Sequence, residues 1–231
     1  MTFILGLFIG SFLNVLIYRI PRGESVVWPG SHCGQCGHAL KPIDLVPVLS
    51  YLFLRGKCRY CGAHISFRYP FVELLTAFAF LLVYYQYGYT VWTAAGCVLA
   101  ALLIVVAFTD IDEGIIPDVI TYPGMLIGLA FSFFTIGIKS ALIAMLGFGL
   151  IFFLIAILSR GGMGGGDVKL VAVIGAFVGP INSVLVFIIS SLAGGLWALG
   201  LLLFKGAGRK TEVRFGPFLA LAGFIAFLYG S

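Results

Sequence analysis

Acidic residues with the potential for proton-transfer chemistry gather in two short stretches of this 231-residue chain. The first stretch, residues 108–118, reads FTDIDEGIIPD and holds four of the nine acidic residues directly after an apolar run. The second, residues 161–169, reads GGMGGGDVK and sets Asp167 between a run of glycines and another apolar run. Ionisable side chains are costly beside membrane-type segments and usually mark a functional site. The sequence therefore predicts that Asp110 and Asp167 meet in space and do acid–base chemistry at a membrane face.

A pair of carboxylates can hydrolyse a peptide bond without a metal, a serine or a thiol. The two groups share one proton, because like charges about 3 Å apart cannot both be ionised. The ionised carboxylate takes a proton from water, and the protonated one donates its proton to the carbonyl oxygen. Gly164 and Gly166 precede Asp167, and glycines there would let an extended substrate backbone approach closely. The two stretches together fit the chemistry of an aspartic peptidase.

Structural roles remain open for these acidic residues. Asp167 stands where a helix N-cap belongs, so it could serve only as a cap for the helix that follows. Asp118 follows Pro117 and could likewise cap a helix. Asp112 and Glu113 could belong to a solvated loop. The sequence alone does not exclude these alternatives.

Three polar residues lie in apolar runs nearer the N-terminus. Ser11 and Asn14 interrupt the first run and either hydrogen-bond across helices or contact a substrate or cofactor. Glu73 lies near the start of the second run, and an acid inside a membrane should have a partner. We expect Arg68 or a lysine in a cavity to be that partner, and we treat Glu73 as a further site candidate.

Four cysteines form two C-x-x-C pairs, Cys33-Gly-Gln-Cys36 and Cys58-Arg-Tyr-Cys61. This pattern is typical of zinc ribbons, in which each pair makes a tight turn that points two thiolates at one metal ion. The sequence predicts a structural zinc ion bound by all four cysteines. Two disulfides are the alternative, which a cytoplasmic location would disfavour. We expect the fifth cysteine, Cys97, to pack as an inert side chain in its apolar run.

The composition is that of an integral membrane protein. Hydrophobic residues make up 61% of the chain and charged residues only 10%, whereas a soluble domain carries about 25% charged residues. The 31 glycines suit close contacts between helices in lipid. The net charge of +5 fits loop lysines and arginines that face an anionic membrane surface. We therefore expect membrane lipids, and no nucleic acid, among the partners.

The apolar runs predict an all-α membrane protein with about eight transmembrane helices. Residues 1–18 form the first helix, residues 19–68 form a cytoplasmic four-cysteine zinc-binding insertion between helices 1 and 2, and residues 69–231 form a polytopic peptidase domain. The later runs cover residues 71–87, 91–107, 119–138, 141–158, 168–179, 181–204 and 215–229.

Lysine and arginine residues set the predicted orientation. If the spans alternate from a cytoplasmic insertion, thirteen of the fourteen lysines and arginines fall on the cytoplasmic side and only Lys139 falls outside. This bias follows the positive-inside rule. Joining the runs on either side of Pro180 into one span would move several cations outside, so we keep two spans there. The same topology places both aspartates at the cytoplasmic face.

These stretches resemble the type IV prepilin peptidases, which remove a leader peptide and also N-methylate their product. The match continues through GSFLNVLIYRIP at residues 10–21, the two cysteine pairs, and LRGKCRYCGAHISFRYPFVE at residues 54–73. It covers nearly the whole chain in the family's order. One departure is Gly34, where many members of the family have proline. The matching residues near the aspartates are Asp110-x-Asp112 with Pro117-Asp118, and Gly164-x-Gly166-Asp167-x-Lys169.

The resemblance implies a prepilin or pseudopilin substrate that is cleaved after a glycine at the cytoplasmic face of the bacterial inner membrane. It implies methylation of the new N-terminal residue from S-adenosylmethionine, and a pilus or type II secretion assembly machinery as a partner. No Rossmann-type glycine pattern indicates a methyl-donor site, so this activity rests on the resemblance alone. The family's catalytic aspartates correspond to Asp110 and Asp167, and its zinc ligands to Cys33, Cys36, Cys58 and Cys61.

Two functions from other classes remain as alternatives. One is a proton-coupled transporter that uses the aspartates as a relay, which should have symmetric halves and helices broken at mid-membrane. The other is a zinc-ribbon membrane scaffold without chemistry, for which Asp110 and Asp167 would be dispensable.

Overall fold

The computed structural model describes residues 1–159, 163–205 and 214–230. The chain forms two compact units, Met1–Tyr89 and Thr90–Ser231. We call them the N-terminal unit and the C-terminal unit and describe each by itself. The start of the predicted glycine run, Gly161 and Gly162, lies outside the described residues. Three of the cations predicted to be cytoplasmic also lie outside them: Arg160, Arg209 and Lys210.

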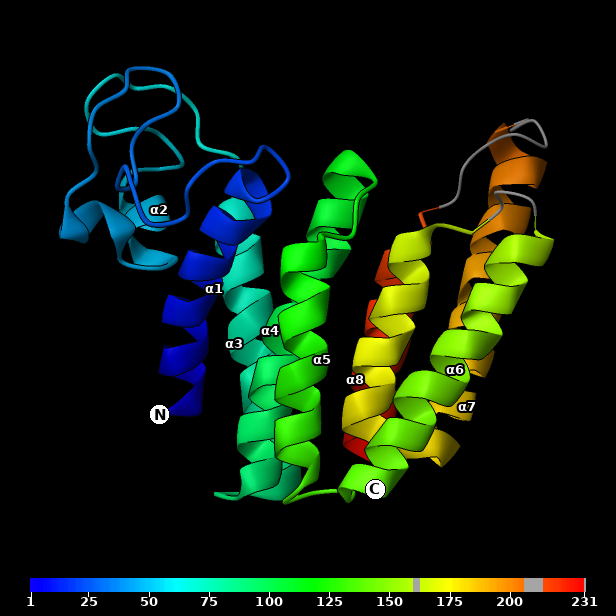
Figure 1. The fold of residues 1–231 in the computed structure, drawn as a ribbon. Coiled ribbons are helices and arrows are strands. Elements are labelled where there is room, and N and C mark those ends of the chain that lie inside the picture. Colours follow the sequence, from blue (N-terminus) through cyan, green and yellow to red (C-terminus); the bar gives the residue numbers. More distant parts are fainter. Residues whose placement is uncertain (160–162, 206–213, 231) are drawn as a thin grey trace. The chain divides into compact units, whose positions relative to one another are not determined.

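The N-terminal unit pairs two long helices that flank the cysteine-rich segment. Helices α1 (Thr2–Arg19) and α3 (Arg68–Tyr87) pack against each other in opposite directions (Figure 1). The segment between them contains η1 (Pro42–Leu45) and α2 (Leu49–Phe53). A carbon atom added at Gly6 would lie 2.5 Å from the Cα of Ala77, so the two backbones are in close contact there. Small residues allow such contacts between helices in lipid.

The two compact units meet at Tyr89, whereas the domains predicted from the sequence, residues 1–18, 19–68 and 69–231, follow changes in polarity and stay a prediction. The change in polarity at residue 69 suggested that α3 belongs with the later spans. In the structure α3 packs on α1, and the compact unit ends at Tyr89. A carbon atom added at Gly10 of α1 would lie only 2.7 Å from the Cα of Glu73 in α3. Such a long-range contact leaves no trace in the local composition.

The C-terminal unit consists of five helices: α4 (Val91–Glu113), α5 (Asp118–Ser132), α6 (Ile138–Leu158), α7 (Gly165–Lys205) and α8 (Gly216–Tyr229). Helix α7 is interrupted at Gly179, whose φ of 79° and ψ of 178° are not helical. Proline at the next position disfavours the α conformation at the residue before it. Figure 1 shows the first half of α7 in yellow and the second half in orange, running in opposite directions. This break agrees with the two separate runs predicted on either side of Pro180.

Helix α7 is central to the packing of the C-terminal unit, because it contacts α5, α6 and α8. Glycines again mark the closest contacts. A carbon atom added at Gly175 would lie 3.0 Å from the backbone of Ala144 in α6, and one at Gly223 of α8 would lie 2.9 Å from Ile174. Helix α8 also packs against α4. The first half of α7 is therefore held on several sides.

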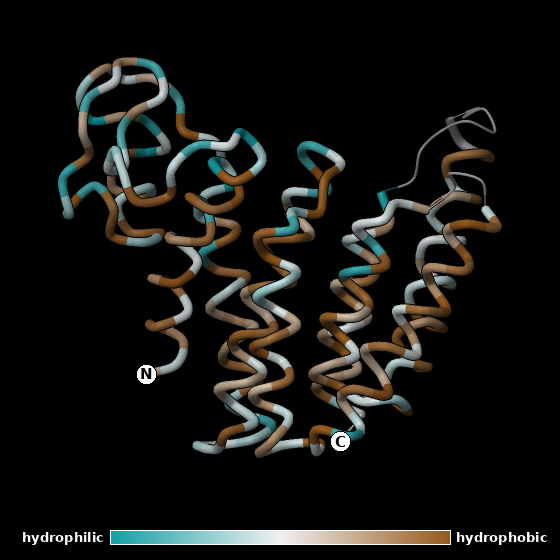
Figure 2. The backbone as a smooth tube through the Cα atoms, viewed as in Figure 1, coloured by the Kyte–Doolittle hydropathy of each residue, from teal (hydrophilic) through white to brown (hydrophobic). Residues whose placement is uncertain are grey.

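The helices have the length and polarity that a membrane requires. Five of those described, α1, α3, α4, α6 and α7, are long and apolar enough to cross a membrane, and α5 and α8 are shorter apolar helices. Hydrophobic residues run along the helices, and hydrophilic residues collect in the cysteine-rich segment (Figure 2). The prediction of an all-α membrane protein is confirmed. Counting both halves of α7 gives eight apolar helical segments, but the number of membrane crossings stays a prediction.

One helix is shorter than the sequence predicted. The run from residue 119 to residue 138 suggested a continuous span, whereas α5 ends at Ser132 and α6 begins at Ile138. Gly137 has a positive φ of 84°, and its N–H donates to the carbonyl oxygen of Ser132 at 2.8 Å. Apolar residues fill this turn, so hydropathy alone does not reveal it.

Candidate active site and cysteine cluster

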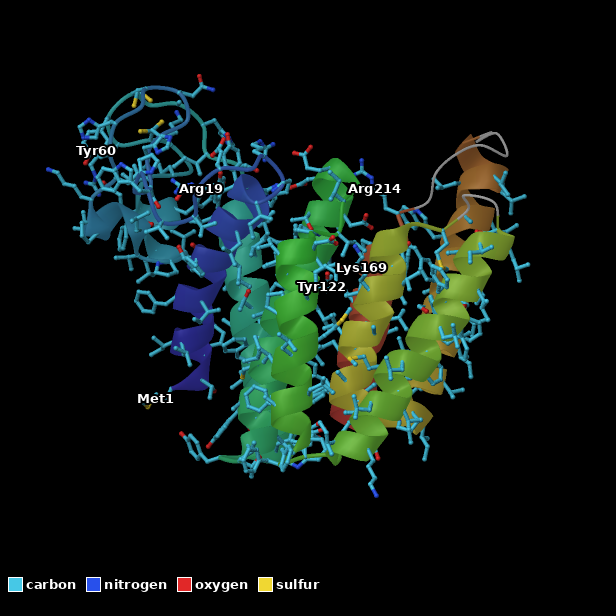
Figure 3. All side chains as sticks on the ribbon, in the orientation of Figure 1. Met1, Arg19, Tyr60, Tyr122, Lys169 and Arg214 are labelled. Atoms are coloured by element: carbon cyan, nitrogen blue, oxygen red, sulfur yellow. The ribbon has the colours of Figure 1, made fainter. Side chains whose placement is uncertain are left out.

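Asp110 lies in the last turn of α4 and is buried, with 6% of its surface exposed. Its Oδ2 accepts a hydrogen bond of 3.0 Å from the backbone N–H of Gly216, the first residue of α8. The positive charge of Arg214, labelled in Figure 3, also acts on this carboxylate. The first N–H groups of a helix have no partner within the helix and attract negative charge. The start of α8 therefore orients Asp110.

Asp167 lies in the first turn of α7 and is 8% exposed. Its Oδ2 accepts a hydrogen bond of 3.2 Å from the backbone N–H of Gly164, just before the helix begins. A carboxylate that bonds back in this way is one half of a capping box. Asp167 thus has the capping role that the sequence left open, but from inside the first turn rather than from the N-cap position.

The two aspartates share one electrostatic environment within the C-terminal unit, because the charge of Asp110 acts on Asp167. Asp110 comes from the C-terminal end of α4, and Asp167 comes from the N-terminal end of α7. Both carboxylates are buried, and each has one oxygen bonded to a backbone N–H. Such a pair of buried acids can hold and transfer a proton.

The glycines before Asp167 have different surroundings. A carbon atom added at Gly166 would lie 2.7 Å from the Cβ of Ile116, in the loop between α4 and α5. One added at Gly164 would lie 3.4 Å from Oδ2 of Asp167, and one at Gly165 would meet nothing within 4 Å. The packing of the protein itself therefore requires glycine at 166. From the sequence we expected the glycines only to make room for a substrate, and we did not predict that Gly166 packs against Ile116.

Gly216 is a residue of the site that was not predicted from the sequence. A carbon atom added there would lie 2.6 Å from Oδ2 of Asp110, so a larger residue would displace the carboxylate. The sequence did hold a clue, because Gly216 directly precedes Pro217 at the start of an apolar run. Proline in the first turn is typical of a helix N-terminus, and helix N-termini attract anions.

The other acidic candidates of this unit are exposed. Asp112 and Glu113 belong to the last turn of α4 rather than to a loop. Asp118 is the first residue of α5, and its Oδ1 lies 2.5 Å from Nζ of Lys169 in α7. This amine also lies 5.2 Å from the centre of the Tyr122 ring, which Figure 3 labels beside Lys169. Exposed ion pairs contribute little stability, so the pair links α5 and α7 only weakly.

Glu73 belongs to the N-terminal unit and therefore to a different unit from the aspartates. It is 8% exposed. Its Oε2 accepts a hydrogen bond of 2.7 Å from the backbone N–H of Val48, and the hydroxyl of Ser11 lies beside its side chain. The partners described for Glu73 are thus a backbone N–H and a hydroxyl, where the sequence suggested Arg68 or a lysine.

The four cysteines of the C-x-x-C pairs converge. Their sulfur atoms all lie within 4.8 Å of one another, and those of Cys33 and Cys61 are 3.8 Å apart. Four sulfur atoms at about 2.3 Å around a tetrahedral zinc ion would be about 3.8 Å apart. All five cysteines are free thiols, so the structure does not contain the two disulfides that were the alternative to a metal site. Backbone N–H groups of Cys36 and Gln35 lower the pKa of the Cys33 thiol to about 6, which favours its thiolate. The N–H of Ala63 lowers the pKa of the Cys61 thiol, but burial and the neighbouring thiols outweigh it and raise that pKa to about 11.

The two cysteine pairs form matching turns. Gly37 and Gly62 follow the pairs and have positive φ values of 69° and 72°, a conformation that glycine adopts at little steric cost. The N–H of Gly37 donates to the carbonyl oxygen of Cys33 at 2.8 Å, and that of Gly62 to Cys58 at 2.9 Å. Each turn thereby directs two thiols to the same side. The geometry fits a metal ion with four sulfur ligands.

Asp44 ties η1 to the second cysteine pair. Its carboxylate accepts hydrogen bonds from Nε of Arg59 at 2.6 Å and from the hydroxyl of Tyr60 at 3.0 Å. The Arg59 guanidinium, followed by the N–H of Lys41, lowers the pKa of Asp44. The Asp44 side chain is 2% exposed, whereas that of Arg59 is 45% exposed. This cluster holds the insertion together beside the cysteines.

Comparison with known proteins divides the chain much as the structure does. Residues 4–87 match the model of the bacterial peptidase A24 N-terminal domain. Residues 97–199 match the model of the type IV leader peptidase family. The first range lies within the N-terminal unit and carries the cysteines, and the second lies within the C-terminal unit and carries both aspartates. No solved structure matches the chain.

Curated relatives are similar over almost the whole chain, and each is named prepilin leader peptidase/N-methyltransferase. The protein from Myxococcus xanthus is 40% identical over 91% of this chain, which spans 65% of that protein. The protein from Pseudomonas putida is 34% identical over 98% of this chain and 89% of its own length. The Aeromonas hydrophila protein is 35% identical over 100% of this chain and 90% of its own length. The chain therefore belongs to the type IV leader peptidase family.

Proposed function

We propose that this protein is a membrane aspartic endopeptidase that cleaves the leader peptide of type IV prepilins or pseudopilins after a glycine. It then N-methylates the new N-terminal residue with S-adenosylmethionine as methyl donor. The observation that carries the proposal is the buried pair Asp110 and Asp167 at two helix termini of one unit. Membership of a leader peptidase family and the names of the relatives support the substrate and both activities.

The aspartates act as one unit that shares a proton. The N–H groups of Gly216 and Gly164 each bind one carboxylate oxygen and so fix the two groups in orientation. The ionised carboxylate removes a proton from water, whose oxygen forms a bond to the carbonyl carbon, while the other carboxyl donates its proton to the carbonyl oxygen. The carbon–nitrogen bond then breaks, the leaving amine takes up a proton, and the pair is ready for another cycle. We assign no fixed acid or base role to either member.

The site opens to the cytoplasm in this proposal, and the protein resides in the bacterial inner membrane. The distribution of lysines and arginines supports this orientation. Cysteines introduced near Tyr89, Lys139 and Asn182 should react with an impermeant reagent applied from the periplasmic side. Cysteines introduced near Lys57 should not react with this reagent. A reaction at those positions from the periplasmic side would contradict the topology.

The cysteine cluster binds a structural Zn²⁺ ion in this proposal. The convergence of the four sulfur atoms, at separations that suit a tetrahedral ion, supports zinc. The ion would be held by Cys33, Cys36, Cys58 and Cys61, and it would supply folding free energy to a segment with few regular elements. A pilus or type II secretion assembly machinery would receive the processed product.

Incubation of the purified protein with a prepilin peptide tests the proposal. Mass spectrometry should show loss of the leader after the glycine, and gain of one methyl group only when S-adenosylmethionine is present. Asp110→Asn and Asp167→Asn proteins that retain their zinc should leave the peptide intact. Near-normal cleavage by either folded variant would overturn the mechanism and favour the scaffold alternative.

A further inference from the structure

The N-terminal unit contains a cavity of about 540 Å³ that neither the aspartate pair nor the metal site explains. It lies between α1, α3 and the cysteine-rich segment, so both helices and the insertion line it. Ligand pockets in proteins usually have volumes of about 300–1,000 Å³. The tyrosines Tyr18, Tyr51 and Tyr69 contribute to its walls, and aromatic rings can stack on a planar heterocycle. The cavity thus has the size and walls of a small-molecule site.

Asn14 contributes to the lining of this cavity and carries an unsatisfied acceptor. Its side chain is 3% exposed, and its Nδ2 donates to the carbonyl oxygens of Gly10 at 3.2 Å and Tyr69 at 3.1 Å. Both of those partners only accept hydrogen bonds, so they fix which end of the amide carries the oxygen. Within the described residues, Oδ1 of Asn14 is a buried side-chain oxygen without a hydrogen-bond partner. A buried acceptor in this state is costly unless a ligand supplies a donor.

Glu73 adds negative charge to the same wall. It is buried, it lines the cavity, and its described partners are the neutral groups Val48 N–H and Ser11. The lining also holds Glu24, Arg19 and the Arg59–Asp44 pair. Arg59 is paired with Asp44, and Arg19 donates to two backbone carbonyl oxygens. The cavity therefore presents the carboxylates of Glu73 and Glu24 and the guanidinium of Arg19, none of which has a charged partner among the hydrogen bonds described above. The carboxylates suit a ligand that carries hydrogen-bond donors and positive charge, and the guanidinium of Arg19 in the same lining could face an acidic group of that ligand.

We infer that this cavity binds S-adenosylmethionine, with Asn14 and Glu73 contacting the cationic methionyl end and the tyrosines lining the adenosine end. This inference rests on the proposed N-methyltransferase activity and assigns it a site. The methyl donor carries an ammonium group and a sulfonium, which match the acceptors, a carboxylate, which could face Arg19, and a planar base, which matches the aromatic walls. In the transfer, the nitrogen lone pair of the cleaved product forms the bond to the methyl carbon. The carbon–sulfur bond breaks with its electrons left on sulfur, and the nitrogen releases one proton.

Equilibrium binding of radiolabelled S-adenosylmethionine to the purified full-length protein tests the site directly. Glu73→Gln keeps the shape of the side chain and an oxygen that can accept from Val48, but removes the charge. We expect it to weaken binding about tenfold or more, as for the loss of a charged hydrogen bond. Val15→Trp should also weaken binding, because Val15 lines the cavity and the larger ring would fill it. S-adenosylhomocysteine lacks the sulfonium charge, so a larger loss for S-adenosylmethionine than for S-adenosylhomocysteine in Glu73→Gln would place that charge beside Glu73.

Thr76→Val provides the matched control. Thr76 is buried on the next turn of α3, and its hydroxyl bonds back to the carbonyl oxygen of Val72 at 2.8 Å, outside the cavity lining. This variant should bind the methyl donor as the unchanged protein does, and retained zinc reports folding in every variant. Unchanged affinity in both folded Glu73→Gln and Val15→Trp would overturn the site. If the unchanged protein cleaves prepilin but neither binds the methyl donor nor methylates, the proposed methyltransferase activity itself fails, which is a distinguishable result.

Discussion

The cysteine cluster and the aspartate site are encoded by the sequence in different ways. In the cluster, each C-x-x-C pair is followed by its own glycine, and a backbone hydrogen bond within the same few residues closes each turn. The aspartate site combines the last turn of α4, the first turn of α7 and the first residue of α8. The first geometry is local and the second is assembled over long distances along the chain. The comparison teaches that a motif specifies a local cluster of cysteines almost completely, but names only some members of a cluster built by packing.

The largest effect should come from the aspartates themselves. Asp110→Asn and Asp167→Asn should each lower prepilin cleavage by about 10³-fold or more, because neither half of the pair can transfer protons alone. The double variant should be no worse than either single variant, since groups that act as a unit are not additive. Cleavage rates measured under single-turnover conditions provide the comparison.

Exposed acids provide the control for that experiment. Asp112→Asn and Asp118→Asn should change the cleavage rate only slightly, because both side chains are exposed and the Asp118–Lys169 pair is weak. If the losses of the two single aspartate variants instead multiplied in the double variant, Asp110 and Asp167 would act independently, and the site would not be one assembled unit.

Glycine substitutions should have the next largest effect, and they test the part of the site that packing supplies. A methyl group at Gly216 would lie 2.6 Å from Oδ2 of Asp110. Gly216→Ala should therefore lower cleavage by about 10²-fold, because small misplacements of catalytic groups are costly. Gly165→Ala is the matched control, since a methyl group there meets nothing within 4 Å. Equal rates for the two variants would mean that α8 does not orient Asp110.

The sequence predicted what depends on residue type and spacing. Asp110 and Asp167 stood out because acids are rare in this apolar chain, and the break before Pro180 followed from the geometry of proline. Gly216, the packing of Gly166 on Ile116 and the pairing of α3 with α1 depend on contacts between distant segments. No local pattern reports such contacts. The cavity beside Asn14 was not predicted either, because distant segments of the chain form it. Asn14 and Ser11 were nevertheless unusual as polar residues within an apolar run.

Loss of zinc should act mainly on the N-terminal unit. Replacing Cys33 and Cys36 by serine should release the metal and unfold the insertion, because structural zinc contributes about 10 kcal/mol or more to small metal-binding domains. Methylation should be lost before cleavage, since Cys33 and Cys58 line the cavity assigned to the methyl donor. Elemental analysis and parallel assays of the two activities provide the measurement. Cys97→Ala should retain the zinc, and equal loss of both activities on zinc removal would contradict the separation of the two regions.

The smallest effect should come from Asp44, which stabilises the insertion without binding the metal. Arg59 lowers the pKa of Asp44 in the folded insertion. A carboxyl group with a lowered folded-state pKa contributes stability that is complete above its unfolded pKa of about 3.9 and is lost as the pH falls through the folded value. Asp44→Asn should therefore lower the urea concentration at which the insertion releases zinc. The difference from the unchanged protein should be small, because Arg59 is 45% exposed.

The pH dependence of that difference separates Asp44 from the cysteines. Between pH 7 and pH 5 the carboxylate stays ionised in both folded and unfolded chains, so the difference in urea midpoint between the two proteins should remain constant. The thiolates, in contrast, take up protons over this range, so the midpoint of each protein should fall as the pH falls. Glu24→Gln is the control, because Glu24 is an exposed acid of the same insertion. A difference that changed markedly between pH 7 and pH 5 would show that Asp44 acts through the metal ligands. The cysteine cluster would then have to be described as including Asp44 of η1.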